Sequence, residues 1–194
     1  RNINPVCKER DFLNEAFSLD GVGYVVRGVT PKGDGLVLDV SAAPVTPKLP
    51  ILPGYEAPTF AWRGAGEAEQ TLESYRGRVV VLDFWAGWCA PCVAEMPTFS
   101  RLLAQFEGEP VTVIGINLDR TEDAFRESVA TLGVDWPQAF DGADGPISSL
   151  YRIEGIPMTY VLDAGGIIRA RGVRGDDLVE MVGEVLEEMA SQKT

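Results

Sequence analysis

Two cysteines, Cys89 and Cys92, are the side chains of this sequence whose type and spacing best suit chemistry. Cysteines three positions apart meet the short Cα–Cα distance that a disulfide requires. A thiolate attacks a disulfide in another molecule, and a second nearby thiol then displaces the product. We therefore predict dithiol–disulfide exchange, with Cys89 as the exposed attacking thiol and Cys92 as the resolving thiol.

A structural metal site is the alternative use of such a pair, because zinc is often bound by cysteines at this spacing. The sequence has no histidine and only one further cysteine, Cys7. Four soft ligands therefore cannot be assembled without carboxylates. We expect no metal and no organic cofactor, only a redox-active disulfide between Cys89 and Cys92. Cys7 is either an incidental thiol or the partner of a cysteine outside this chain.

The elements on either side of the cysteine pair predict where it lies. Residues 79–85 form a nearly unbroken apolar run, the pattern of a parallel strand covered on both faces. Apolar residues then recur at helical spacing through 93–106, and Pro91 suits a first helical turn. Cys89 is therefore predicted at a helix N-terminus, where unpaired N–H groups and the helix dipole favour a thiolate.

Strands and helices are predicted to alternate through the rest of the chain, as in an α/β protein. Residues 111–118 form a second buried strand and complete a right-handed βαβ unit. Thr121 is the predicted N-cap of a helix that Gly133 ends. The later predicted elements are a short strand at 138–140, a brief helix at 147–151, a strand opened by Pro157, an antiparallel edge strand at 167–171 and a helix capped by Asp176 that runs through Ala190.

The run from Asp83 to Cys92, followed by Pro97, resembles thioredoxin. Glu95-Met96-Pro97 is similar to the extracytoplasmic TlpA/ResA-type branch of that superfamily. The resemblance covers roughly residues 57–190 and implies an α/β thioredoxin-like fold, with a central mixed sheet flanked by helices and an inserted helix and strand. The stretch before Cys89 is not the Pro-x-x-x-Thr-x-x-Cys motif of peroxiredoxins, so peroxidase activity is not expected.

The resemblance also implies where a substrate binds. The residues alone favour an ordinary trans proline at the start of a strand for Pro157. In thioredoxin-like proteins, however, the proline after Gly-Ile is cis and faces the cysteine pair. Ile156 would then offer its backbone N–H and C=O to an extended substrate. Trp88 is expected to form part of an apolar rim around the thiols and to contact the substrate.

Two carboxylates near the cysteines each allow two interpretations. Asp83 lies inside an apolar strand, where it either points to a polar edge or satisfies backbone donors. By resemblance it is instead the buried aspartate that deprotonates Cys92 during resolution. Glu95 is either solvated or, as in ResA-like proteins, tunes cysteine acidity. The lysine that accompanies the aspartate in thioredoxin is missing, because Gly115 stands at the corresponding position.

The N-terminal part of the chain is predicted to be an extension outside the thioredoxin-like domain. Residues 1–43 are interpreted as the tail of an upstream domain. They include a short helix at 8–17 and a β-hairpin whose strands lie at 24–26 and 36–40. An isolated hairpin is barely stable in water, so it must pack either on the thioredoxin-like domain or on a domain missing from this chain, and we favour the second.

Closely spaced prolines predict a linker at residues 44–56, because they forbid helix and favour extended backbone. The thioredoxin-like domain is predicted at 57–194, with its entry strand at 57–62. No signal peptide or membrane span is visible in this sequence. Since it begins at Arg1, we expect a processed or shortened form, and the resemblance implies an extracytoplasmic location in the periplasm or cell envelope.

The charge and the motifs together predict a protein-disulfide reductase. The formal net charge of −12 argues against nucleic acid as a partner, because phosphate contacts need clustered Lys and Arg. The resemblance implies protein substrates with cysteine pairs and a membrane electron donor, and the chain is expected to be monomeric. The alternatives are a disulfide oxidant or isomerase, a copper-delivery module that clamps Cu(I) between two thiolates, and a non-enzymatic redox sensor.

Overall fold

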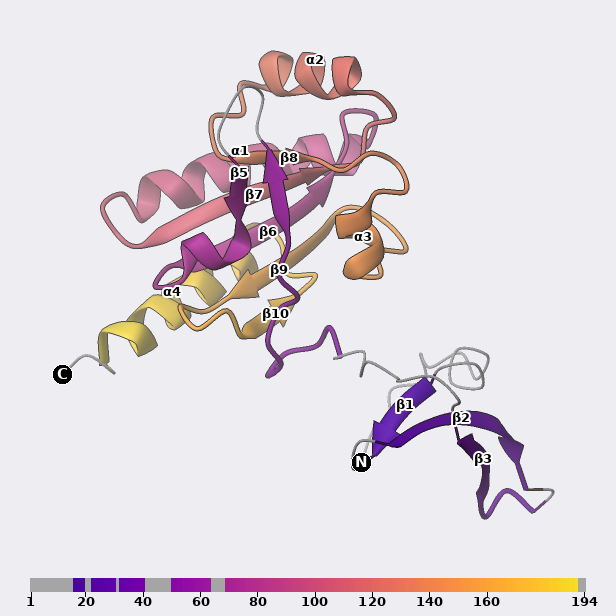
Figure 1. Ribbon diagram of the computed structural model, residues 1–194. Coiled ribbons are helices and arrows are strands. Elements are labelled where there is room, and N and C mark those ends of the chain that lie inside the picture. The colour runs from indigo at the N-terminus through magenta and orange to yellow at the C-terminus, as the bar shows by residue number, and fades with distance from the viewer. Residues whose placement is uncertain (1–15, 20–21, 31, 41–49, 64–68, 192–194) are drawn as a thin grey trace. The chain divides into compact units, whose positions relative to one another are not determined.

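The chain forms two compact units, residues 1–49 and residues 50–194 (Figure 1). The strands of each unit pair only with strands of the same unit in the described residues. Every predicted site residue belongs to the second unit. None of the described helices is both long and apolar enough to cross a membrane. The computed structural model describes residues 16–19, 22–30, 32–40, 50–63 and 69–191.

The first unit contains an antiparallel sheet of three strands. The predicted hairpin is confirmed. The second and third strands of this sheet pair with each other across a turn, in which the Gly33 N–H donates to the Thr30 carbonyl at 2.8 Å. The helix predicted at 8–17 is wrong at its end, because Phe17 pairs with Tyr24 and the sheet takes up its backbone groups. Residues 8–15, and Cys7, lie outside the described residues. The strands are β1 (Ala16–Leu19), β2 (Val22–Val29) and β3 (Leu36–Val40).

The second unit is built on a mixed sheet of five strands in the order β10-β9-β6-β7-β8. Strands β6, β7 and β8 are parallel, whereas β9 and β10 run antiparallel to them, which confirms the predicted mixed sheet. All residues of β6 and β7 are buried, as their apolar runs predict for strands covered on both faces. The strands are β6 (Val79–Trp85), β7 (Val111–Asn117), β8 (Gln138–Phe140), β9 (Met158–Leu162) and β10 (Ile168–Arg171).

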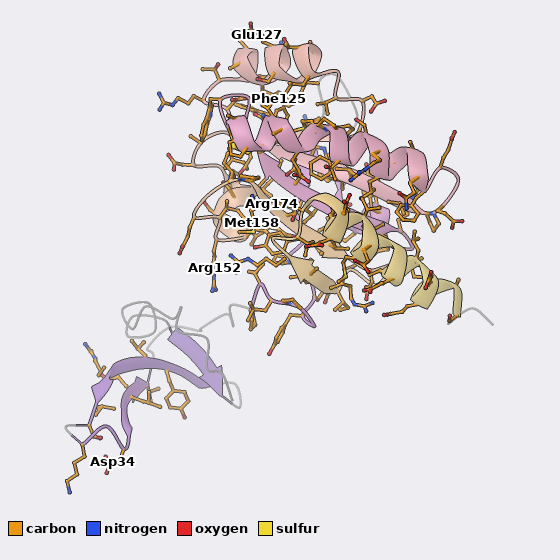
Figure 2. All side chains as sticks on the ribbon, turned by 180° about the vertical axis from the view of Figure 1, so that it is seen from behind. Asp34, Phe125, Glu127, Arg152, Met158 and Arg174 are labelled. Atoms are coloured by element: carbon orange, nitrogen blue, oxygen red, sulfur yellow. A yellow bond between two sulfur atoms is a disulfide. The ribbon has the colours of Figure 1, made fainter. Side chains whose placement is uncertain are left out.

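Helices α1 (Ala90–Gln105) and α4 (Gly175–Ser191) lie side by side over one face of this sheet (Figure 2). An ion pair of 2.6 Å between Arg101 and Asp176 joins them. The prediction that Asp176 caps the last helix is wrong, because α4 already begins at Gly175. Asp176 instead lies in the first turn of α4. Its carboxylate bonds Arg101 there and is stabilised by the positive end of the helix dipole.

Side chains of β6 alternate between the two faces of the sheet, and this separates the predicted site from the aromatic core. Phe84 packs against Tyr151 and Tyr160 on one face, with ring centroids 5.4 and 6.1 Å apart. Asp83 therefore points to the other face, which α1 and α4 cover. A short helix, α3 (Pro146–Leu150), ends just before Tyr151 and is shifted by one residue from its prediction.

Helix α2 (Glu122–Leu132) has the boundaries that the sequence predicts. The Thr121 side chain accepts a hydrogen bond from the Ala124 N–H at 3.2 Å, which satisfies one unpaired donor of the first turn. Gly133 ends the helix with a φ of 64°, a left-handed conformation that costs glycine little. This helix belongs to the connection from β7 to β8, the inserted helix and strand that the resemblance implies.

The segment predicted as a linker, 44–56, spans both units. Residues 44–49 lie outside the described residues, whereas Ile51 is buried in the core of the second unit. Gly54 donates to the Ile168 carbonyl at 2.8 Å, and Ile168 donates to the Tyr55 carbonyl at 2.9 Å. Residues 50–56 therefore pack against the edge strand β10 instead of bridging two domains.

The entry strand predicted at 57–62 is shorter than expected and displaced toward its C-terminal end. Only β4 (Ala61–Arg63) is a strand, and it pairs with β5 (Glu69–Thr71). Residue 57 instead donates its N–H to the Gly166 carbonyl at 2.9 Å, outside any strand. A single 3-10 turn, η2 (Leu72–Tyr75), then leads into β6.

Candidate active site

Cys89 and Cys92 form a disulfide at the N-terminus of α1, with their Cα atoms 5.2 Å apart. Cys89 is the N-cap residue, and its Sγ accepts a hydrogen bond from the Cys92 N–H at 3.3 Å. An N-terminal N–H group that already points at Sγ would stabilise negative charge there once the disulfide is reduced. The predicted position of the pair is confirmed, and its local geometry favours a thiolate on Cys89.

The exposure of the pair differs from the prediction. In the disulfide form Cys89 is only 5% exposed and Cys92 is 2% exposed. The prediction that Cys89 is exposed is therefore wrong for this state. Trp88 is 66% exposed, which places a large apolar surface directly beside the pair. Trp85 is fully buried, and its Nε1 donates to Gln138 at 2.9 Å. Of the two tryptophans, only Trp88 is placed to contact another protein.

The Ile156–Pro157 peptide bond is cis, as the resemblance implies. Met158 pairs with Phe84 in the antiparallel register of β9 and β6, so Pro157 comes level with the end of β6. The chain leaves β6 there and enters the cysteine motif. Pro157 is buried and Ile156 is half-buried, and both stand at the edge from which the thiols emerge.

Asp83 is buried, with 2% of its surface exposed, and no described residue hydrogen-bonds its Oδ2 atom. Burial, and after it the Glu95 carboxylate, raise the pKa of this carboxyl to about 8, although the Arg174 guanidinium opposes both. The two structural interpretations of Asp83, a polar edge and full pairing with backbone donors, both fail. A buried carboxyl that titrates near neutral pH suits proton transfer to and from a thiol.

Glu95 joins the active-site helix to the last helix. It is half-buried on α1, one turn beyond Cys92, and its Oε1 accepts a hydrogen bond from the Gly175 N–H at 2.6 Å. Gly175 is the first residue of α4, so the carboxylate lies at the positive end of that helix. Glu95 is therefore held in a defined place, unlike a solvated surface glutamate.

Two polar residues that sequence reasoning missed, Asn117 and Asp119, hold the loop before Cys89. The Gly87 N–H donates to the Asp119 carboxylate at 3.1 and 3.2 Å, and Asn117 Nδ2 donates to the same carboxylate at 2.9 Å. Asn117 and Asp119 are buried, and a Cβ on Gly87 would collide with Ser128. A carboxylate that follows a buried parallel strand was the available signal, because strand C-termini meet at one edge of a sheet.

Arg174 is the other residue that the sequence did not indicate. It lies between β10 and α4, and its Nη2 donates to the Pro157 carbonyl at 2.8 Å. An isolated arginine before a helix carries no motif, so only the folded chain brings it to the cis-proline. The position that corresponds to thioredoxin's lysine is Gly115, so it carries no cation. A Cβ there would collide with the side chain of Gln138.

A family model described as AhpC/TSA matches residues 53–171, which is more than half of the chain. This chain belongs to the AhpC/TSA family. The match includes both cysteines, both carboxylates and the cis-proline, and it ends at the last residue of β10. Arg174 and α4 lie beyond it.

Curated proteins are similar to this AhpC/TSA-family chain. Thiol-disulfide oxidoreductase ResA of Oceanobacillus iheyensis is 31% identical over 144 residues, covering 72% of this chain and 74% of the relative. Thioredoxin-like protein YneN of Bacillus subtilis is 30% identical over 122 residues, covering 61% and 70%. These relatives support the resemblance to the ResA-type branch.

Solved structures agree with the fold. The thioredoxin domain of a thiol-disulfide oxidoreductase from Bacteroides vulgatus superposes with a TM-score of 0.64 at 25% identity, covering 70% of this chain and 98% of that one. A thiol:disulfide interchange protein from Bacteroides sp. gives a TM-score of 0.63 at 25% identity, covering 70% and 91%. The thioredoxin-like fold is confirmed, and with its Cys89–Cys92 disulfide the chain is a thiol-disulfide oxidoreductase.

Proposed function

We propose that the chain works in the reducing direction and opens disulfides in other proteins. The observation that carries this proposal is the buried carboxyl of Asp83, which has a pKa of about 8 and lies on the strand that leads into the CxxC pair at the N-terminus of α1. A base that titrates near neutral pH is useful for activating the resolving thiol, which is the step that releases a reduced product. The proposal needs no metal and no organic cofactor.

The first step is attack by the reduced pair. The Cys89 thiolate, stabilised by the Cys92 N–H and the α1 dipole, attacks one sulfur of the substrate disulfide. A bond forms between Cys89 Sγ and that sulfur, while the other substrate sulfur leaves as a thiolate and takes up a proton. The exposed Trp88 and the backbone of Ile156 beside cis-Pro157 hold the substrate segment during this exchange.

The second step releases the substrate. Cys92 transfers its thiol proton to the Asp83 carboxylate and attacks Cys89 Sγ, so the mixed disulfide breaks and the Cys89–Cys92 disulfide forms. The second substrate sulfur leaves as a thiolate and is protonated. The substrate has gained two electrons and two protons, and the enzyme is left oxidised, with the disulfide that the structure contains.

A further partner must return the pair to the dithiol state. We propose a donor at the membrane and a location outside the cytoplasm, in the periplasm or cell envelope, as the resemblance to the TlpA/ResA-type branch implies. The substrates are proteins with cysteine pairs, and the enzyme acts as a monomer. A search for the donor should begin with membrane-bound dithiol proteins, because one dithiol supplies both thiols that the exchange consumes.

Trapping of the mixed disulfide tests the proposal. Cys92→Ala removes the resolving thiol and should accumulate covalent complexes with substrate proteins, which are released by dithiothreitol. Cys89→Ala is the matched control and should trap nothing. If Cys92→Ala traps no partner in an extract of the source cell while the purified wild type also fails to reduce a protein disulfide, the reductase proposal is wrong.

The reduction potential separates a reductant from an oxidant or isomerase, which would use the same residues. We expect a value near that of thioredoxin, about −270 mV, when the protein is equilibrated in graded dithiol buffers. A value near about −120 mV would identify an oxidant. Cu(I) delivery predicts stoichiometric binding that outcompetes a strong chelator, and we expect the reduced pair to lose that competition.

A further inference from the structure

The connection between β10 and α4, residues 172–174, and the first residue of α4 contact both halves of the site. On the cis-proline side, the Gly172 N–H donates to the Thr159 carbonyl at 2.8 Å and Arg174 donates to the Pro157 carbonyl at 2.8 Å. On the thiol side, the N–H of residue 175 donates to Glu95 at 2.6 Å. One short segment therefore ties the substrate-binding strand to the helix that carries the cysteines.

The bond from Arg174 fixes the peptide that follows the cis-proline. The Pro157 carbonyl accepts this bond from a guanidinium, and a charged donor forms stronger hydrogen bonds than a neutral donor does. The adjoining residue, Ile156, carries the backbone groups that the proposed substrate strand would bind. Loss of the guanidinium would leave the Pro157 carbonyl without this partner and would loosen the peptide on which the substrate aligns. Figure 2 shows Arg174 and Met158 near the start of α4.

Arg174 also acts on Asp83. Asp83 pairs with Thr159 across β6 and β9, and Thr159 is hydrogen-bonded to Gly172 and Val173, the two residues before Arg174. The described groups that act electrostatically on this buried carboxyl are Glu95 from α1 and Arg174 from the connection, with opposite signs. From β9, the Thr159 hydroxyl donates to the Val173 carbonyl at 2.5 Å and so is committed elsewhere. From β7, the residue level with Asp83 is a glycine. The side chains that α4 buries are apolar: Leu178, Val182 and Val185.

We propose that Arg174 is a positioning residue for the exchange reaction: it holds the cis-Pro157 carbonyl for substrate binding and supplies positive charge to the Asp83 carboxylate. This inference rests on the proposed function for its first part only. The second part concerns a proton on Asp83 and is measurable without any substrate. It assigns a role to a residue beyond the matched family segment, which ends at residue 171.

The experiment compares Arg174→Met, Arg174→Lys and the wild type as reduced proteins of residues 1–194. With insulin as a protein disulfide, Arg174→Met should attack about tenfold more slowly, the loss expected for one hydrogen bond to a charged donor. With dithionitrobenzoate, a small disulfide that needs no backbone alignment, its rate should match that of the wild type. Arg174→Lys keeps a charged donor and should recover at least part of the insulin rate.

Carbon-13 NMR of the Asp83 carboxyl tests the charge directly. Arg174→Met should move its titration to higher pH, because the group that favours the carboxylate is gone, whereas Arg174→Lys should titrate close to the wild type. Arg101→Met is the matched control, since it removes an exposed arginine that pairs with Asp176 across the same two helices. It should change neither the insulin rate nor the Asp83 titration.

The outcomes separate the two proposals. An unchanged insulin rate in Arg174→Met, or an equal loss with insulin and dithionitrobenzoate, would overturn the positioning role. An unchanged Asp83 titration would overturn the charge role. If the wild type reduces dithionitrobenzoate but not insulin, the proposed function is wrong, and the NMR titration still decides the part of the inference that concerns Asp83. Thermal melts confirm that each variant is folded.

Discussion

Asp83 sets the pH behaviour expected at the scale of single residues. Its carboxyl has a folded-state pKa of about 8, against 3.8 for an ordinary aspartate, because burial penalises the charged form. The folded protein therefore binds more protons than the unfolded chain between these two values. Stability is present in full below the lower value and is lost as the pH rises toward about 8. The site keeps a carboxyl where an uncharged residue would be more stable.

Asp83→Asn should remove this loss. We expect the free energy of unfolding of the oxidised wild type to fall as the pH rises from about 4 to about 8. At pH 7 the loss should have reached up to about 4 kcal/mol. The same measurement on Asp83→Asn should give a flatter curve and a more stable protein at neutral pH. Urea unfolding at a series of pH values measures both. A wild-type curve parallel to that of the variant would show that Asp83 is not perturbed.

The same substitution should damage resolution. Asp83→Asn cannot accept the Cys92 proton, so release of a preformed mixed disulfide should slow by about a hundredfold at pH 8, the lower range for a general base. The wild-type rate should increase with pH through the Asp83 titration, and the variant rate should not. Stopped-flow measurement of product thiol follows both rates. An identical pH profile in the two proteins would exclude Asp83 as the base.

Glu95→Gln tests the opposite electrostatic influence on Asp83. The amide oxygen of glutamine still accepts the hydrogen bond from the Gly175 N–H, so the contact with α4 is retained while the charge is lost. Removing a like charge should move the Asp83 titration to lower pH, as followed by carbon-13 NMR. Exposed Glu180 on α4 offers a control, and Glu180→Gln should leave that titration in place.

At the scale of elements, the site depends on connections and much less on strands. The loop from β6 to α1 is held by Asp119 after β7, and the cis-proline is held by the connection from β10 to α4. The strands carry few groups that react. They bring three loop segments to one edge of the sheet, where the loops hold the thiols and the substrate-binding backbone.

Asp119→Ala should destabilise the protein through the active-site loop. The Gly87 N–H and the Asn117 amide would both lose their acceptor in a buried place, which costs about 1–3 kcal/mol for each unsatisfied group. We expect the midpoint of urea unfolding to fall accordingly. Asp135→Ala alters an exposed aspartate and should change the midpoint little. Equal midpoints for the two variants would show that the loop does not need Asp119.

At the scale of the whole molecule, the chain divides at residue 50 and the chemistry belongs to one side. The second unit contains the disulfide, the cis-proline and both carboxylates, and its core includes Ile51. The first unit has its own antiparallel sheet with exposed Val37 and Val40. Separation of the two should therefore leave exchange chemistry intact.

A shortened chain, residues 50–194, should keep the reduction potential and the dithionitrobenzoate rate of the full chain. A chain of residues 57–194, which starts at the boundary predicted from the prolines, should be less stable by about 2–4 kcal/mol. It loses the burial of Ile51 and the hydrogen bonds between residues 54–55 and Ile168. Urea unfolding of the two shortened proteins compares them, and equal stability would mean that residues 50–56 are a linker after all.

Local pattern was sufficient for much of the second unit. The apolar runs of β6 and β7, the N-cap at Thr121 and the place of Cys89 at the start of α1 follow from periodicity and capping chemistry, which act between neighbours in the chain. The role of Pro157 came from the resemblance to thioredoxin, because a proline at a strand start is trans by default. The residues most directly tied to redox chemistry were therefore readable in the sequence.

Only the tertiary structure decided which groups meet these residues. Arg174 is distant in sequence from Pro157 and Asp83, and Asp119 from Gly87, and no spacing rule links them because a sheet brings together strand ends that are far apart in the chain. The same reason explains why the boundary of the predicted linker, at residue 56, is wrong. Ile51 becomes a core residue only because residues 54–55 pair with β10 in the folded chain. The pKa of Asp83 likewise depends on α1 and α4 covering its strand, which composition cannot express.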